Sequence, residues 1–136
     1  MRMELTRRAD YAIRTVIALA RATPGEPQSV RRVAADQRVP VAFLPQVMRD
    51  LVRAGLVEGT IGRKGGYRLA KPSIEISLLE IVDAVEGDRP PRVCVLRGGP
   101  CARNDVCDVH AVFASAQDDV LRRLRATSVA ATIAAD

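Results

Sequence analysis

The stretch VAFLPQVMRDLVRAGLVEGTIGRKGGYRLAKP, residues 41–72, decides the fold. Its first part, residues 41–54, repeats apolar residues at helical spacing, and Gly55 is typical of a helix C-terminus. Two short apolar segments follow, and between them lies the basic tip Gly62-Arg63-Lys64-Gly65-Gly66. Because glycines allow the backbone to turn tightly, this pattern predicts a helix followed directly by a β-hairpin.

The helix over residues 41–54 has two distinct faces. Its predicted apolar face consists of Phe43, Leu44, Val47, Met48 and Leu51. Its outer face carries Gln46, Arg49 and Arg53. Pro45 is unusual within such a helix, because proline removes a backbone donor and restricts the preceding residue. The helix therefore begins later than residue 41 or has an irregular first turn.

Two further helices are predicted upstream of this segment. The first covers residues 6–22, with Thr6 as its N-cap, and a Pro- and Gly-containing turn follows at 23–28. Ser29 caps the second, which the Arg-Val-Pro step at 38–40 ends. Two helices joined by a short turn, with polar residues outside on the second, are typical of a helix-turn-helix. The hairpin directly after it is predicted to be a wing.

The downstream part is predicted to be helical on either side of a loop. Ser77 caps a helix that Gly87 ends, and residues 88–106 carry Pro, Gly and Cys without periodicity. A long helix then runs from about Asp108 to Arg125, and a short tail helix is capped by Thr127 or Ser128. The apolar stripe of the long helix has no later partner in its own chain except the tail. The expected fold is mostly α with a small β-hairpin wing.

The composition favours a polyanionic partner without requiring one. The chain has 136 residues, 21 Lys+Arg against 16 Asp+Glu, and a formal net charge of +5. Nucleic acid is the commonest polyanion that basic proteins bind. No apolar run approaches the roughly 20 residues that span a bilayer, and the N-terminus lacks an apolar signal stretch. We therefore expect a cytoplasmic protein with no membrane partner.

Three groups of residues are candidates for contacting DNA. Arg63 and Lys64 at the wing tip would reach phosphates or a narrow minor groove. The outer residues of the third helix would reach base edges or phosphates. The start of the first helix offers Thr6, Arg7 and Arg8 to phosphate oxygens. The alternative is an ordinary hairpin beside solvated helix faces, but the order of three helices and a basic hairpin favours DNA binding.

The three cysteines lie in one short segment, CVLRGGPCARNDVCDVH, residues 94–110. Cys94, Cys101 and Cys107 can turn their thiolates toward one centre, and thiolates select zinc, cuprous copper or iron–sulfur clusters. Cys107 and His110 are three residues apart at the start of the long helix, so they are expected to share a face. The alternatives are oxidant-sensing thiols, a structural zinc site, inert cysteines and a surface histidine. A zinc site usually has a closely spaced ligand pair, which is missing here.

Several motifs together resemble the IscR/NsrR family of winged-helix regulators, often called the Rrf family. They are LTRRADYAIR (5–14), VAFLPQVMRDLVRAGLV (41–57), GRKGGYRLAK (62–71), SLLEIVDAVEG (77–87) and the three-cysteine loop. The resemblance covers nearly the whole chain. It implies a homodimer whose long helices cross between subunits, and a palindromic double-stranded DNA operator. The expected domains are a winged helix-turn-helix domain (1–87), a cluster loop (88–107) and a dimerisation helix with its tail (108–136).

The resemblance also implies an iron–sulfur cluster held by the three cysteines. In IscR-like members a histidine three residues after the last cysteine completes a two-iron (2Fe-2S) cluster, and His110 occupies that place. In NsrR-like members a carboxylate from the first helix of the other subunit completes a four-iron (4Fe-4S) cluster, and Asp10 occupies that place. We favour His110 and the two-iron cluster. Asp10 also has a simpler interpretation, an i,i+4 pair with Arg14.

Two departures from the family pattern limit what carries over. The first cysteine gap is six residues here, where familiar members more often have about five. Pro45 stands where IscR-like members carry an acidic residue that tunes base choice, so the operator preference is not expected to carry over.

Three other functions compete with the iron–sulfur regulator. The first rival is a cluster-free regulator that depends on thiols or zinc. The second is a small iron–sulfur carrier or electron-transfer protein, against which the winged-helix pattern stands. An enzyme is not expected, because the sequence has no nucleophile–base pair and no phosphate-binding glycine motif.

Overall fold

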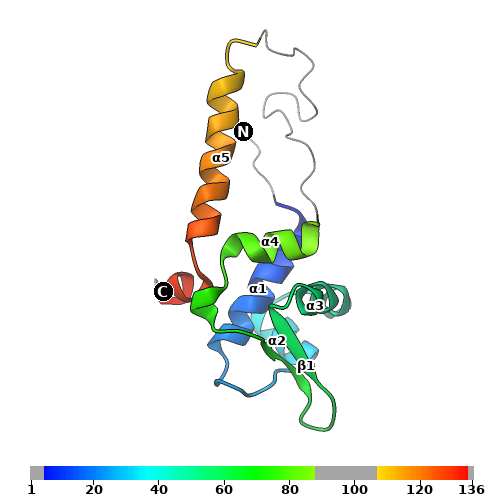
Figure 1. Ribbon diagram of the computed structural model, residues 1–136. Coiled ribbons are helices and arrows are strands. Elements are labelled where there is room, and N and C mark those ends of the chain that lie inside the picture. Colours follow the sequence, from blue (N-terminus) through cyan, green and yellow to red (C-terminus); the bar gives the residue numbers. More distant parts are fainter. Residues whose placement is uncertain (1–4, 88–106, 135–136) are drawn as a thin grey trace.

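A computed structural model describes residues 5–87 and 107–134, and Figure 1 shows how its elements are arranged. The helices are α1 (Arg7–Arg21), α2 (Val30–Gln37), α3 (Leu44–Arg53), α4 (Leu78–Glu86), α5 (His110–Ala126) and α6 (Val129–Ala134). The strands β1 (Val57–Thr60) and β2 (Gly66–Leu69) pair antiparallel, and short 3-10 turns cover Val41–Phe43 and Ser73–Glu75. The predicted class, mostly α with a hairpin wing, is confirmed.

Local capping chemistry explains where three helices begin. The hydroxyl of Thr6 accepts a hydrogen bond from the backbone N–H of Ala9 at 3.2 Å, and Ser29 caps α2 in the same way. Ser77 forms a capping box with Glu80, because each side chain accepts from the other residue's backbone N–H, at 3.1 and 2.8 Å. All three caps were predicted, since a cap depends only on residues within one turn.

Glu80 adds a pH-dependent term to stability. Burial alone would raise the pKa of Glu80, but hydrogen bonds from the Ser77 backbone and from Lys71, at 2.9 Å, hold it below the ordinary value of 4.5. Because the pKa of Glu80 is lower in the folded than in the unfolded state, its ionised form stabilises the fold at any pH above the unfolded-state pKa. This stabilisation is lost as the pH falls through the folded-state pKa.

We therefore expect Glu80→Gln to keep the cap and to reduce the loss of stability below about pH 4.5. At neutral pH the cost should stay within about 1 kcal/mol, because the pair with Lys71 is partly exposed. Urea unfolding between pH 3 and 7 would measure both effects. Ser77→Ala, which removes the cap but not the charge, is the control, and it should lower stability at every pH. If the stability of Glu80→Gln fell at low pH as steeply as that of the unmodified protein, Glu80 would not be the source of this pH dependence.

The structure resolves the problem posed by Pro45. A 3-10 turn covers Val41–Phe43 and α3 begins at Leu44, so Pro45 falls in the first helical turn, where its missing N–H has no intrahelical partner to lose. One prediction was wrong: Phe43 is 46% exposed and does not belong to the core. Phe43 is the last residue of the 3-10 turn, and its ring lies beside that of Tyr11, with the centroids 5.4 Å apart.

The core is aliphatic and forms around α1. Helix α1 contacts α2, α3, α4 and α6, and the inward face of α1 includes Val16, which is fully buried. The other largest buried apolar side chains are Leu44, Met48, Leu51, Ile76, Ile81, Val33, Val47, Val57 and Val129. This packing agrees with the absence of Trp from the sequence and fixes α3, the second helix of the predicted helix-turn-helix, against α1 and α4.

The second strand of the wing, β2, is tied to the segment before α2. Gln28 and Tyr67 exchange two backbone hydrogen bonds of 2.8 Å, so Gln28 extends the hairpin as an isolated bridge. A Cβ on Gly66 would lie 2.5 Å from the carbonyl oxygen of Gln28, and the φ of Gly66 is 152°. Only glycine allows this close approach, which explains why the wing needs it here.

The C-terminal part leaves the domain and then returns to it. In Figure 1, α5 projects away from the domain, and no residue of α5 is buried. The chain then turns back: the Val129 N–H donates to Ile76 at 2.8 Å, and Ser128 rather than Thr127 caps α6 by accepting from Ala131. The tail thus packs on the winged-helix domain. Within the described ranges, no helix is both long and apolar enough to cross a membrane.

Candidate nucleic-acid interface and cysteine site

The eight candidate DNA-contacting residues are all exposed. They come from three places: the start of α1 (Thr6, Arg7, Arg8), the outer face of α3 (Gln46, Arg49, Arg53) and the wing tip (Arg63, Lys64). The α3 group forms one connected cluster with Arg8, described next. Exposure leaves each of these side chains available to a large ligand.

Asp50 connects the first two groups, and we did not predict it as a site residue. Its side chain is only 5% exposed, yet it lies on α3 between the outward-facing Arg49 and Arg53. The Arg8 guanidinium donates to Oδ2 at 2.6 Å, the Gln46 amide donates to Oδ1 at 3.2 Å, and Arg53 lies 3.8 Å away. The Arg49 guanidinium donates to the side-chain amide oxygen Oε1 of Gln46 at 3.3 Å. One buried carboxylate therefore orients the polar surface of α3.

A groove of 580 Å³ separates α3 from the wing. Pro45, Arg49 and Val52 line one side, and Thr60 and Ile61 line the other. The Ile61 side chain is fully exposed next to the basic tip. The wing and α3 thus present a continuous surface of mixed apolar and basic character beside the groove.

The start of α1 is already partly occupied within the chain. Besides capping the helix with its hydroxyl, Thr6 donates its backbone N–H to the Glu86 carboxylate at 3.0 Å. A carboxylate there is favourable, because the N-terminal end of a helix carries partial positive charge. Glu86 ends α4, so this contact joins the first DNA candidate group to the end of α4.

The cysteine site is described only in part. Cys94 and Cys101 lie outside the described residues. Cys107 is half-buried and forms no disulfide, and the backbone N–H of the exposed His110 donates to its carbonyl at 3.2 Å. The predicted shared helix face was wrong, because α5 begins at His110 and Cys107 lies in the turn before it. The turn nevertheless keeps a thiol and an imidazole close in the chain, and both are donors that suit an iron–sulfur cluster.

Asp10 has the simpler partner that the sequence suggested. Its carboxylate accepts from the Arg14 guanidinium at 2.8 Å in an exposed i,i+4 pair. Among residues 5–87 and 107–134, no three His, Cys, Asp or Glu side chains are grouped to hold a metal. The predicted ligand set includes two cysteines outside those ranges, so it stays a prediction.

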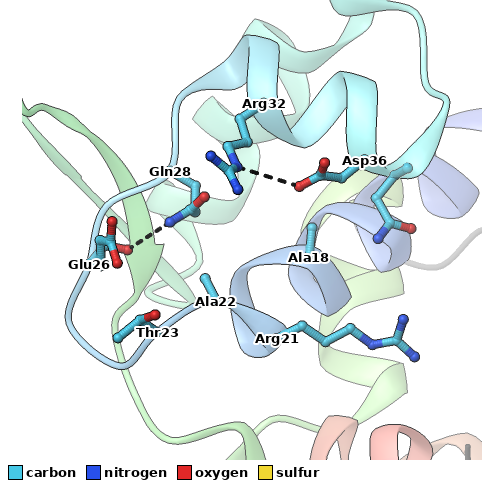
Figure 2. Close-up of a pocket in the computed structure, with 9 residues that line it drawn as sticks. Ala18, Arg21, Ala22, Thr23, Glu26, Gln28, Arg32 and Asp36 are labelled. Atoms are coloured by element: carbon cyan, nitrogen blue, oxygen red, sulfur yellow. Dashed lines mark hydrogen bonds and ion pairs between the residues drawn. The ribbon is translucent and has the colours of Figure 1, made fainter.

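A second, polar pocket lies away from the candidate residues. It has a volume of 420 Å³ between the end of α1, the following turn and α2, and Figure 2 shows its lining. Arg32 faces Asp36 at 3.8 Å, and the Gln28 amide donates to the Glu26 carbonyl at 3.4 Å. None of the predicted DNA or cluster residues lines this pocket.

Comparison with known proteins places the chain in a family. Residues 5–135 match the family model Rrf2, described as an iron-dependent transcriptional regulator. The chain is 34% identical over 112 residues to the HTH-type transcriptional regulator NsrR of Shouchella clausii, covering 82% of this chain and 75% of that protein.

Two solved structures have the same fold. The IscR of T. potens superposes with a TM-score of 0.75 at 21% identity, over 96% of this chain and 86% of that one. CymR, the global cysteine regulator of B. subtilis, superposes with a TM-score of 0.80 at 22% identity, over 99% of both chains. These relatives are regulators rather than enzymes, as expected. The chain belongs to the Rrf2 family of winged-helix, DNA-binding transcriptional regulators.

Proposed function

We propose that this protein is a cytoplasmic, homodimeric transcriptional regulator whose affinity for a palindromic DNA operator is set by an iron–sulfur cluster. The observation that carries the proposal is the position of Cys107 and His110. They form the turn that leads directly into α5, a helix with no buried residue of its own. A ligand site in this turn would therefore control the direction of the helix proposed to join two subunits.

The DNA face would combine α3, the wing and the start of α1. The α3 side chains Gln46, Arg49 and Arg53 suit the major groove, which admits a helix and presents base edges. Arg63 and Lys64 would then contact the flanking backbone or minor groove, and Arg7 and Arg8 would contact phosphates. The common exposure of these residues supports this assignment.

A second copy of the chain would cover the exposed apolar stripe of α5. Val112 is 68% exposed and Val120 is 39% exposed, about two helical turns further along α5. Apolar side chains in a row on a projecting helix favour a helix–helix partner. Pairing through α5 would place two DNA faces in one particle, as a palindromic operator requires.

The cluster would be held by Cys94, Cys101 and Cys107. With His110 as the fourth ligand it would be a two-iron cluster, which we favour; with Asp10 of the partner subunit it would be a four-iron cluster. Such a group, when bound, supplies a centre that responds to redox state, nitric oxide or iron–sulfur supply. The Arg14 ion pair of Asp10 supports His110, because Asp10 would have to leave Arg14 in order to act as a ligand.

Two contacts would connect the loop to DNA binding. Glu86 stands directly before Gly87 and the loop, and it accepts the N–H of Thr6, next to Arg7 and Arg8. At the other end, the turn at Cys107 sets the start of α5. A change in the loop would therefore act on a DNA-contacting helix end and on the dimer helix together. Coupling of about 1–3 kcal/mol would change affinity about 5- to 150-fold.

Anaerobic purification tests the proposal. Iron and acid-labile sulfide would be measured in the purified protein. A DNA sequence that the protein selects from a random pool would then be used to compare the DNA affinity of the cluster-loaded and cluster-free forms. We expect iron and sulfide in the purified protein and an affinity difference of at least about fivefold. A colourless protein without sulfide, even after reconstitution, would contradict the cluster.

The same experiment separates the rival functions. Zinc without sulfide, or reversible oxidation of the thiols with a change in DNA affinity, would identify a cluster-free regulator. Cluster binding without salt-dependent DNA binding would instead identify a carrier or electron-transfer protein.

A further inference from the structure

Asp50 is an unexpected residue to find on a helix that faces DNA. Together with Thr15, it is one of the two buried polar residues in the described part of the chain, and the only charged one. A carboxylate in this position repels the phosphates of the ligand and weakens binding. Its burial and its contacts with Arg8, Gln46 and Arg53 indicate that it orients the side chains around it.

We propose that Asp50 is a positioning residue that fixes which base Gln46 reads and limits non-specific binding through Arg8. The proposal rests on the DNA-reading role given above to α3. It extends that role by assigning the selectivity to a residue that is itself shielded from the ligand.

The amide of Gln46 is held in one orientation. Its Nε2 donates to Asp50 Oδ1 at 3.2 Å, and its Oε1 accepts from Arg49 at 3.3 Å. An ionised carboxylate only accepts and a guanidinium only donates, so turning the amide over would break both contacts. Gln46 is therefore left with one free donor hydrogen and one free acceptor lone pair. This is the pair that matches N7 and N6 of adenine in the major groove.

Asp50 also competes with DNA for Arg8. The Arg8 guanidinium contacts Asp50 at 2.6 Å while its side chain stays 51% exposed. A phosphate must therefore compete with an internal carboxylate that is always present. Because every DNA sequence offers phosphates, this competition lowers non-specific affinity without favouring any base.

The test replaces Asp50 with Asn, which has the same shape but no charge. Because an Asn amide can both donate and accept, Gln46 is no longer held in one orientation. We expect the preference for adenine at one position of each half-site to fall about tenfold, within the range of a bidentate base contact. We also expect several-fold tighter binding to random DNA, with a salt slope steeper by up to about 0.9 for the released arginine.

Asp36→Asn is the matched control. Asp36 is exposed on α2 and pairs with Arg32 at 3.8 Å, so its substitution adds the same net charge away from α3. If both variants changed the DNA affinity and the salt slope equally, net charge alone would explain the effect, and the proposal would be overturned. A uniform loss of affinity with unchanged base preference and salt slope, as a merely structural role predicts, would also overturn it.

A second variant keeps the proposal testable if Asp50→Asn folds poorly. Gln46→Met leaves the contact between Asp50 and Arg8 in place, and it should abolish the adenine preference without the gain in random-DNA binding that the release of Arg8 gives Asp50→Asn. Retention of the adenine preference in Gln46→Met would overturn the proposal. If the unmodified protein selected no sequence, the DNA-reading role of α3 would fail instead, so the two failures are distinguishable.

Discussion

Val112→Asp is expected to convert the proposed dimer into a monomer and to lower operator affinity by about a hundredfold. Val112 is 68% exposed in the single chain, so a charge there leaves the fold of the protomer intact. In a symmetric dimer through α5, the substitution would bury two carboxylates against apolar side chains, which is costly without partners. A monomer loses the gain from binding two half-sites at once, which is typically 10²- to 10⁴-fold, so about a hundredfold is the lower end.

Ala111→Asp is the matched control for this experiment. Ala111 is also exposed and is the neighbouring residue, but it lies about 100° away around the helix. Light scattering would give the mass of both variants, and fluorescence anisotropy would give their affinity for the operator and for a single half-site. Val112→Asp should bind the half-site as the unmodified protein does. A dimeric Val112→Asp protein with full operator affinity would show that α5 does not join the subunits.

Cys107→Ala is expected to abolish the iron–sulfur cluster that we propose. It would remove one of the three proposed thiolate ligands, and the remaining ligands could not complete the coordination of the iron. Anaerobically purified Cys107→Ala should therefore lack visible absorbance and acid-labile sulfide, and its DNA affinity should equal that of the cluster-free protein. The fold should survive, because Cys107 is only half-buried and precedes α5 without entering the core.

Paired substitutions then identify the fourth ligand. His110→Ala should change the absorbance spectrum and speed the loss of iron, whereas Asp10→Ala should change neither, because the Asp10 carboxylate is engaged by Arg14. Arg14→Ala is a useful control, since it frees Asp10 without removing a carboxylate. The reverse result, with four irons lost on Asp10→Ala, would assign the site to a cluster shared between subunits.

Features governed by one helical turn were predictable from the sequence. Thr6, Ser29 and Ser77 cap the helices expected of them, and Gly87 ends α4. Pro45 signalled an irregular start, and the 3-10 turn before α3 is that irregularity. In each case the controlling residues are adjacent in sequence, so the pattern contains the whole interaction.

Features that depend on distant residues were not predicted. Arg8 and Asp50 are 42 positions apart, and nothing in local periodicity links them. A signal was nonetheless present, because Asp50 follows Val47 by three residues and adjoins Leu51, which places an acid at the edge of the buried face. The docking of α6 through Val129 was missed for the same reason, since its partner Ile76 lies far upstream.

The paired hydrogen bonds between Gln28 and Tyr67 restrict how a signal can act. They tie the wing to the start of α2, and the tight fit at Gly66 leaves no room for sliding. The winged-helix domain of each protomer in the proposed dimer should therefore bind DNA with α3 and the wing in a fixed arrangement. Regulation would change the distance and the angle between the two winged-helix domains. Operators with altered half-site spacing should then respond differently to the signal, while the base sequence preferred within a half-site stays the same.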